Sequence, residues 1–270
     1  MGFFKRAINK LTSEKVNLRQ RKRLIFFIAI ITALSMTTAT VAWFTVNTFV
    51  GVDTLDLHIS VAAQLKVSME DHGKDLSKYV KVITNEMVDE YLAKQGKKLA
   101  DIVLDPVTTR TGKPLVNKSG TEREPNDISY LEFECYFIAT KDMWVHLTSE
   151  AAENIEGSEG SNVSTTSTGP KADVVNCARA SYETQSDGIA IWEPNRGSPV
   201  NGQNTFDVST PMVYSNNTRL FHLDELTPKK VTVRIWVDGE DPQCDDDVQE
   251  ANLRMAMCFV GCDDNNKPIA

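Results

Sequence analysis

The chain lacks the short motifs that mark the commonest catalytic and metal-binding sites. Its 270 residues contain no HExxH, no GxSxG, no P-loop and no GxGxxG, and no two of its five cysteines form a CxxC. These absences count against metalloprotease, hydrolase, nucleotide-binding and zinc sites. A catalytic triad built from distant residues stays open, because such triads are defined by geometry. We expect no enzyme, since nothing in the chain indicates one.

Basic residues are scarce beyond the N-terminus. Of the 29 basic and 37 acidic residues, residues 1–42 hold eight and one, so 21 and 36 remain in residues 43–270. This body therefore has a net charge of −15. Such a charge repels nucleic acid and excludes it as a partner. It suits a soluble surface, or one that takes up cations.

Charge is missing altogether between Leu24 and Val52. A basic run precedes this segment, its first half is strongly apolar, and its second half is rich in Thr and Ala. The pattern is typical of an export signal over residues 1–42, cut by a signal peptidase between Ala42 and Trp43.

The alternative to cleavage is a permanent signal anchor, since about 20 uncharged residues can span a bilayer. In both cases we expect residues 1–23 to stay cytoplasmic and the body to be exported. Membrane contact is then limited to residues 24–46 before cleavage.

Eight apolar residues alternate with mostly polar ones in the segment TLDLHISVAAQLKVSM, residues 54–69. A period of two predicts a strand, which we expect to bend or break near Ala62–Ala63. The alternating residues are Leu55, Leu57, Ile59, Val61, Ala63, Leu65, Val67 and Met69.

Short strand patterns recur along the rest of the chain. They are SYLEFECYFIAT, MWVHL, DVVNCARASYET, GIAIWEP, VRIWV and NLRMAMCFVG. Residues 83–100 have helical spacing, with Asn85 as a candidate cap, whereas residues 105–129 and 150–170 read as loops, the second one flexible. No internal repeat or second domain is evident. We therefore predict an all-β fold: a jelly-roll-like β-sandwich over residues 43–270 with one short helical insertion.

One acidic stretch, RIWVDGEDPQCDDD at residues 234–247, is the best candidate for bound metal. Calcium prefers several carboxylate and carbonyl oxygens, but the spacing does not match an EF-hand loop. We favour a turn with solvated acids and keep calcium as a weak alternative; no other cofactor is expected. The candidate ligands are Asp238, Glu240, Asp241 and Asp245.

Aromatic and cysteine residues offer two further candidates. Alternation in VTVRIWVDG places Trp236 opposite the core face, which makes it a candidate binding aromatic. Trp192 is a second candidate. Ordinary packing under a covering loop is the alternative. The odd number of cysteines leaves at least one unpaired in the chain. Cys258 and Cys262 are a possible disulfide, and Cys244 is another possible partner for them.

Several of these pieces together resemble the TasA/camelysin-like group of exported Gram-positive proteins, which are made with a SipW-type signal peptide. The most specific pieces are the signal directly followed by the first strand and the W-x-[DE]-G-x-D-x-x-C segment, residues 236–244. LDPVT, YLEFECYFIAT and ARASY…IWEPN add weaker support. The helical segment near residues 83–100 departs from the compact members of the group.

The resemblance implies a jelly-roll-like sandwich, a place in the extracellular matrix or on the cell surface, and a role as a biofilm fibre subunit. In that group the N-terminal strand completes the sheet of a neighbouring subunit. We therefore predict a secreted homopolymer, with Leu55, Leu57, Ile59 and Val61 as donor-strand residues. Camelysins were described as surface proteases, but no metal motif here supports that activity, so it ranks third.

A monomeric surface adhesin is the alternative. It would keep the first strand in its own sheet and would present a concave aromatic patch at the surface.

Overall fold

The computed structural model describes residue 26 and residues 52–62, 64–109, 111–113, 115–117, 128–193, 205–206 and 212–269. The chain divides into two compact units, Met1–Phe49 and Val50–Ala270. In the first unit only Phe26 is described; it is helical and exposed. The predicted cleavage pair Ala42–Trp43 and the rest of the predicted span, residues 24–46, lie outside the described residues. Among those described, no helix is both long and apolar enough to cross a bilayer.

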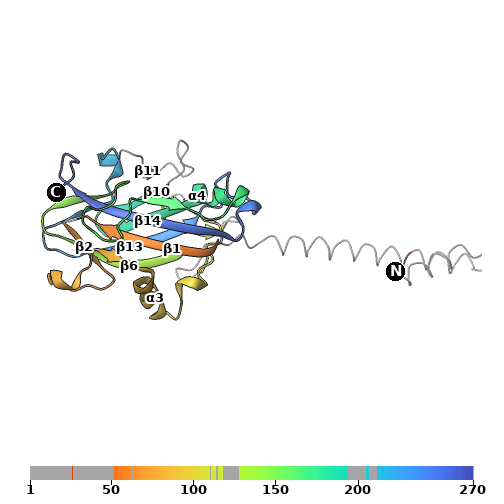
Figure 1. Cartoon of the computed structure of the whole chain (residues 1–270), viewed down its shortest axis with the longest axis horizontal. Coiled ribbons are helices and arrows are strands. Elements are labelled where there is room, and N and C mark those ends of the chain that lie inside the picture. Colours follow the sequence, from red (N-terminus) through yellow and green to blue (C-terminus); the bar gives the residue numbers. More distant parts are fainter. Residues whose placement is uncertain are drawn as a thin grey trace, which may run out of the picture. The chain divides into compact units, whose positions relative to one another are not determined.

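The second unit is mostly β, as predicted, with two large sheets (Figure 1). Sheet A has the order β12 (Phe221–Leu223), β7 (Met143–Leu147), β14 (Ala251–Cys262), β1 (Val52–Val61), β3 (Val82–Ile83), with β8 (Asn162–Ser164) also paired to β14. Sheet B has the order β11 (Thr205–Phe206), β10 (Gly188–Trp192), β9 (Ala178–Thr184), β13 (Lys229–Val237), β6 (Leu131–Ala139), β2 (Leu65–Ser68). A small third sheet joins β4 (Val107–Thr108) and β5 (Val116–Asn117).

Helices are short within the described residues. They are α3 (Asn85–Ala93), α4 (Val174–Cys177) and the 3-10 turns η1 (Leu76–Lys78), η2 (Leu99–Asp101), η3 (Gly169–Asp173), η4 (Asn216–Thr218) and η5 (Asp246–Val248).

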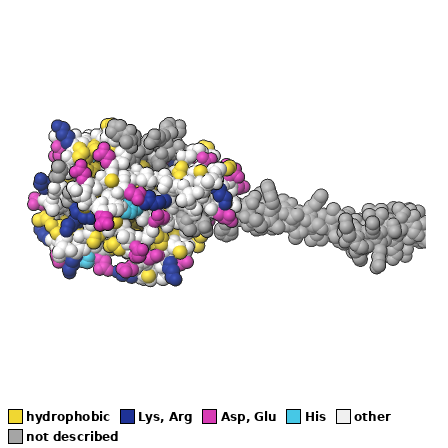
Figure 2. All heavy atoms as spheres, in the orientation of Figure 1, with side chains coloured by type: hydrophobic (Ala, Val, Ile, Leu, Met, Phe, Trp, Pro, Cys, Tyr) yellow, Lys and Arg dark blue, Asp and Glu magenta, His cyan; other side chains and the backbone are white. Residues whose placement is uncertain are grey.

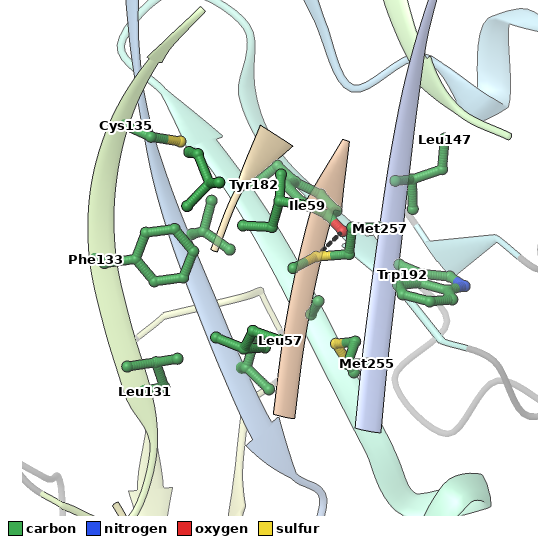
Figure 3. Close-up of a cluster of buried hydrophobic side chains, with 14 of the residues drawn as sticks. Leu57, Ile59, Leu131, Phe133, Cys135, Leu147, Tyr182, Trp192, Met255 and Met257 are labelled. Carbon is green, nitrogen blue, oxygen red and sulfur yellow. Dashed lines mark hydrogen bonds between the residues drawn. The ribbon is translucent and has the colours of Figure 1, made fainter. Parts of the chain in front are cut away.

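The two large sheets share one apolar core because alternate side chains of their strands point toward each other. Phe137 on β6 of sheet B packs against Phe221 and Phe259 of sheet A, with ring centroids 5.2 and 5.0 Å apart. Tyr182 on β9 reaches across in the same way and donates a hydrogen bond to the sulfur of Met257 on β14 at 3.0 Å (Figure 3). The aromatic side chains therefore join the two sheets.

The first strand breaks where the sequence predicts. β1 ends at Val61 in sheet A and β2 begins at Leu65 in sheet B, so the chain crosses between the sheets at residues 62–64. A hydrogen bond of 3.0 Å from the amide of Leu65 to the carbonyl of Ala62 closes the bend. The alternating side chains keep facing the core on both sides of the break.

The predicted helix is α3, but its cap differs from the expectation. Thr84 occupies the N-cap position, and Asn85 is the first helical residue. Val88 and Leu92 are buried, while Met87 and Tyr91 pack partly against the core. The helix ends near Gly96, whose φ of 75° suits a residue without a Cβ.

Both segments predicted as loops contain short strands that sequence patterning missed. Residues 105–129 include β4 and β5, and part of this segment covers the outer face of β13. Residues 150–170 include β8, which pairs with β14. On the face shown in Figure 2, acidic and basic side chains of the second unit are interspersed.

Replacing Phe137 with Ala is expected to lower the free energy of unfolding by about 3–5 kcal/mol. The ring fills the space between the sheets, and its neighbours can only partly close the cavity that its loss would leave. Urea unfolding measures the loss. Val213→Ala is the control, since that side chain is 72% exposed. A loss below about 1 kcal/mol for Phe137→Ala would contradict the packing described.

Candidate functional site

β1 is the element for which the sequence suggests a function, and its position in sheet A is unusual. It runs parallel to β14 along its length, with Leu57 opposite Met255 and Ile59 opposite Met257. On its other side, β3 pairs only with Ile59 and Ser60. Among the described residues, β1 therefore has a strand partner on one edge alone from Val52 to His58.

The four predicted donor-strand residues face the core. Leu55, Leu57, Ile59 and Val61 are 9%, 3%, 1% and 0% exposed. Figure 3 shows Leu57 and Ile59 pointing from β1 toward Leu131 and Phe133 of sheet B. Burying an aliphatic side chain of this size is worth about 1.5–3 kcal/mol. β1 is therefore held both by its pairing with β14 and by apolar side chains that pack between β14 and sheet B, a position called the β1 groove below.

The outward face of β1 makes polar contacts with β14 and with the segment that contains Ser158 and Glu159. Arg254 on β14 donates to Asp56 at 3.0 Å and to Glu159 at 2.6 Å, and this hydrogen bond lowers the pKa of Glu159. Ser60 and Ser158 hydroxyls lie 3.0 Å apart. Asp56, Arg254 and Glu159 are all partly solvated, so their ion pairs contribute little to stability.

Asn85 binds the edge of β1 that has no partner among the strands described. Its Oδ1 accepts a hydrogen bond from the amide of Leu57 at 2.9 Å, and its Nδ2 donates to Asp56 at 2.7 Å. The residue that the sequence suggested as a helix cap thus binds β1 from the first turn of α3. An amide side chain suits this position because it offers both an acceptor and a donor.

Lys81 holds the bend between β1 and β2. Its ammonium donates to the carbonyl of Ala62 at 3.0 Å and to the carbonyl of Leu65. Burial lowers the pKa of Lys81 to about 8, so the side chain is mostly charged at neutral pH. The bend therefore has a cationic side chain that bridges its two ends.

The acidic stretch is more buried than the sequence suggested. Glu240 and residues 245–247 are exposed, but Asp238 and Asp241 are 0% and 3% exposed. Asp241 accepts a hydrogen bond of 2.6 Å from Arg179 on β9, and Arg179 also pairs with Glu193 at 2.6 Å. The prediction of fully solvated acids is therefore wrong for these two residues.

The calcium candidate does not assemble into a site. Asp241 faces the guanidinium of Arg179, Asp238 accepts from the amide of Glu240, and Asp245 accepts from the amide of Asp247. No group of three or more His, Cys, Asp or Glu that could hold a metal occurs in the part of the chain that the structure describes. A fixed cation beside Asp241 would also repel a second one.

Sequence reasoning missed the Arg179, Asp241 and Glu193 cluster because its members come from three separate segments. The available signal was the arginine in ARASY, an otherwise small and apolar strand start. A buried arginine needs an acidic partner, since an unpaired buried charge is very costly.

Trp192 and Trp236 are buried, which corrects their assignment as binding aromatics. They are 1% and 0% exposed. Trp236 does lie opposite the core face of β13, as predicted, but Val107, Leu115 and Tyr130 cover it. The covering-loop alternative is therefore the correct one for Trp236. Trp192 belongs to the main core.

The predicted disulfide between Cys258 and Cys262 does not fit the structure. Both residues lie on β14, four positions apart in one extended strand. That spacing separates their Cα atoms by about 13 Å, roughly twice the span of a disulfide. Cys135 is a core residue, as expected, and burial raises its pKa above the usual range.

A surface hollow of about 590 Å³ lies at the turn between β9 and β10. Its charged lining is already paired: Lys229 with Asp187 and Lys230 with Glu134, each at 2.8 Å, and Glu183 with Arg234 at 2.7 Å. Each of these charged side chains is neutralised by a different neighbour. The charges therefore do not converge on a common point as catalytic groups do.

Comparison of the chain with protein-family models, with curated proteins and with solved structures finds no match. Within the described residues, the predicted donor strand is the candidate site that has a defined geometry, because β1 occupies the β1 groove.

Replacing Asn85 with Ala is expected to speed amide hydrogen exchange along β1, with the largest change at Leu57, and to cost about 1 kcal/mol. Exchange followed by mass spectrometry or NMR measures the change. Asn265→Ala, in an exposed turn away from β1, is the control. Equal β1 exchange in both variants would rule out the role given to Asn85.

Replacing Arg179 with Ala is expected to lower the free energy of unfolding by about 3–5 kcal/mol, because two acidic side chains stay buried without their cation. Lys171→Ala breaks an exposed pair with Glu250 and should cost less than about 1 kcal/mol. Chemical denaturation compares the two, and similar small losses would show that the buried cluster is not stabilising in this way.

Proposed function

We propose that the protein is an extracellular structural subunit that assembles by exchange of β1 between copies. The supporting observation is the way β1 is held: a single full-length strand partner, four buried side chains, and a position directly after the N-terminal segment. Strand exchange between identical chains is a common route to assembly, because the same contacts form within one copy or between two.

The bend between β1 and β2 is the hinge at which exchange would occur. Three residues, 62–64, join the strands, so straightening this short segment would release β1 from its own domain. The apolar alternation runs without a change of phase from Leu55 to Val67. A straightened segment would therefore be one continuous amphipathic strand that projects away from its own domain.

Displacement of β1 would leave β14 with an open edge and would expose the groove that Leu57 and Ile59 fill. A second copy of β1 can restore both the hydrogen bonds and the apolar contacts. In a chain of copies, each domain receives one strand and donates another. This head-to-tail geometry leads to an open fibre rather than a closed dimer.

Export and signal cleavage belong to the same proposal. A strand still tethered to the membrane cannot be donated freely, so cleavage between Ala42 and Trp43 would release assembly. The jelly-roll topology and membership of the TasA/camelysin-like group are also proposed, on the strand patterns and on the chain's repeated passage between the two sheets.

A monomeric surface module is the second candidate, because β1 lies in its own sheet. The aromatic patch expected for an adhesin has less support, since Trp192 and Trp236 are buried. Assembly state separates the two candidates directly.

The test uses the chain beginning at Trp43 with Ser60→Cys. Ser60 lies opposite Cys258 on β14, so oxidation can link the strand to whichever domain holds it. If β1 is exchanged, electron microscopy shows fibres and non-reducing gels show a ladder of covalent multimers. Leu57→Lys should abolish both, because the charge cannot enter the groove.

The control combines Ser60→Cys with Cys258→Ser, which removes the partner thiol and should leave the fibres without cross-links. Discrete particles in all variants, together with a cross-link within the monomer of the Ser60→Cys variant, would instead favour the monomeric module.

A further inference from the structure

Two buried cysteines meet at one end of sheet B. Cys177 directly precedes β9, and Cys244 lies in the turn after β13. These strands are antiparallel neighbours, with Ala178 opposite Val237. The residue before β9 therefore lies beside the residue after β13, and the amide of Asp238 donates to the carbonyl of Cys177 at 2.8 Å.

The turn at residues 238–244 coils tightly and stays at this end of the sheet. The amide of Asp241 donates to the carbonyl of Asp238 at 3.2 Å, and the amide of Cys244 donates to the carbonyl of Asp241 at 2.9 Å. Arg179, two residues after Cys177, holds the side chain of Asp241 at 2.6 Å. Backbone and side-chain bonds thus fix the turn to the segment that carries Cys177.

Both thiols are free in the structure and lie buried in the same core. Cys177 and Cys244 are 0% and 8% exposed, and both belong to the main apolar cluster. The contact with the Cys244 thiol and burial together raise the pKa of Cys177 above its usual range. The Cys177 thiol also donates to the carbonyl of Asp173 at 3.5 Å. Thiols are weak hydrogen-bond donors and acceptors, so the reduced pair gains little from this arrangement.

We infer that Cys177 and Cys244 form a disulfide in the exported protein. The oxidant is a disulfide-bearing protein or small molecule. Its S–S bond breaks, the Cys177–Cys244 S–S bond forms, and two electrons and two protons leave the cysteines to give two thiols on the reduced oxidant. The inference depends on export to an oxidising compartment and is independent of strand exchange.

The timing of the reaction follows from burial. Exchange needs a thiolate, and the folded, buried Cys177 holds its proton. The bond therefore forms while the turn is still open, before residues 238–244 pack onto β9. Once formed, it is shielded from reductants by the same burial.

The other three cysteines do not compete for these partners. Cys135 lies in the middle of β6, and Cys258 and Cys262 lie along β14, too far apart to bond each other. Cys258 is instead beside Ser158, at 3.8 Å between sulfur and oxygen. One disulfide and three thiols then account for the odd number of five cysteines.

The bond would tie the start of β9 to the end of β13 beside the buried Arg179–Asp241 pair. Such a link restrains the unfolded chain, since it closes a long loop. It would also keep the acidic turn in place while Arg179 and Asp241 find each other.

The test refolds residues 43–270, the chain left after the predicted cleavage, in a mixture of oxidised and reduced glutathione. Thiols are then counted in denaturant, and tryptic peptides are mapped without reduction. We expect three free thiols, and a link between peptides 172–179 and 235–254, which carry Cys177 and Cys244 separately from the other cysteines. Reductant should lower the unfolding midpoint by about 5–15 °C.

Cys244→Ala should retain four free thiols and lose the effect of reductant, whereas the control Cys258→Ala should keep both the linked peptides and the effect. Five free thiols after oxidative refolding, or a link between any other pair, would overturn the inference. The peptide map of the unmutated chain decides the question even if a variant fails to fold. Fibre formation is scored separately, so its failure does not bear on the disulfide.

Discussion

The parallel pairing of β1 with β14 is the interaction on which sheet A depends. β14 is the longest strand described, and it has β7 and β8 on one side and β1 on the other. Without β1, half of its backbone hydrogen-bonding groups along Ala251–Phe259 would face solvent, and the core would lose four aliphatic side chains. β1 and β14 lie far apart in the sequence of the second unit, so this part of sheet A forms only when both segments are present.

The buried charges of sheet B, at Arg179 and its acidic partners, position a turn rather than complete a sheet. Arg179, Asp241 and Glu193 bring two acids and one base into a dry environment, where desolvation offsets much of the attraction between them. Such a cluster adds less net stability than an apolar core would, but it allows only one placement of the turn at residues 238–244. This turn carries Cys244, and the amide of Asp238 at its start donates to the carbonyl of Cys177.

Local pattern predicted the strands well, because side-chain alternation reports directly which face is buried. The break near Ala62, the helix after Thr84 and the face of Trp236 all follow from periodicity and turn chemistry. What periodicity cannot report is the identity of distant neighbours. The parallel register of β1 on β14, the loop that covers Trp236, and the acid that pairs with Arg179 depend on contacts between segments far apart in the sequence. The disulfide first suggested, Cys258 with Cys262, failed for a related reason: closeness in sequence becomes separation in space when a strand is extended.

Exchange of β1 is decided by the bend at residues 62–64 rather than by the contacts along the strand. Leu55, Leu57, Ile59 and Val61 bury the same surface in their own domain as in a neighbouring copy, so their contribution cancels between the two states. The contacts of Arg254 and Ser158 with β1 can likewise form with either strand. The bend at residues 62–64 is different, because its hydrogen bonds, including those from Lys81, exist only while β1 folds back onto its own domain. The free energy of that bend therefore opposes exchange, and intramolecular binding has the further advantage of high effective concentration. Assembly then requires that a straight strand from Val52 through Ser68 recover more than the bend provides, through new contacts between adjacent copies at residues 62–64.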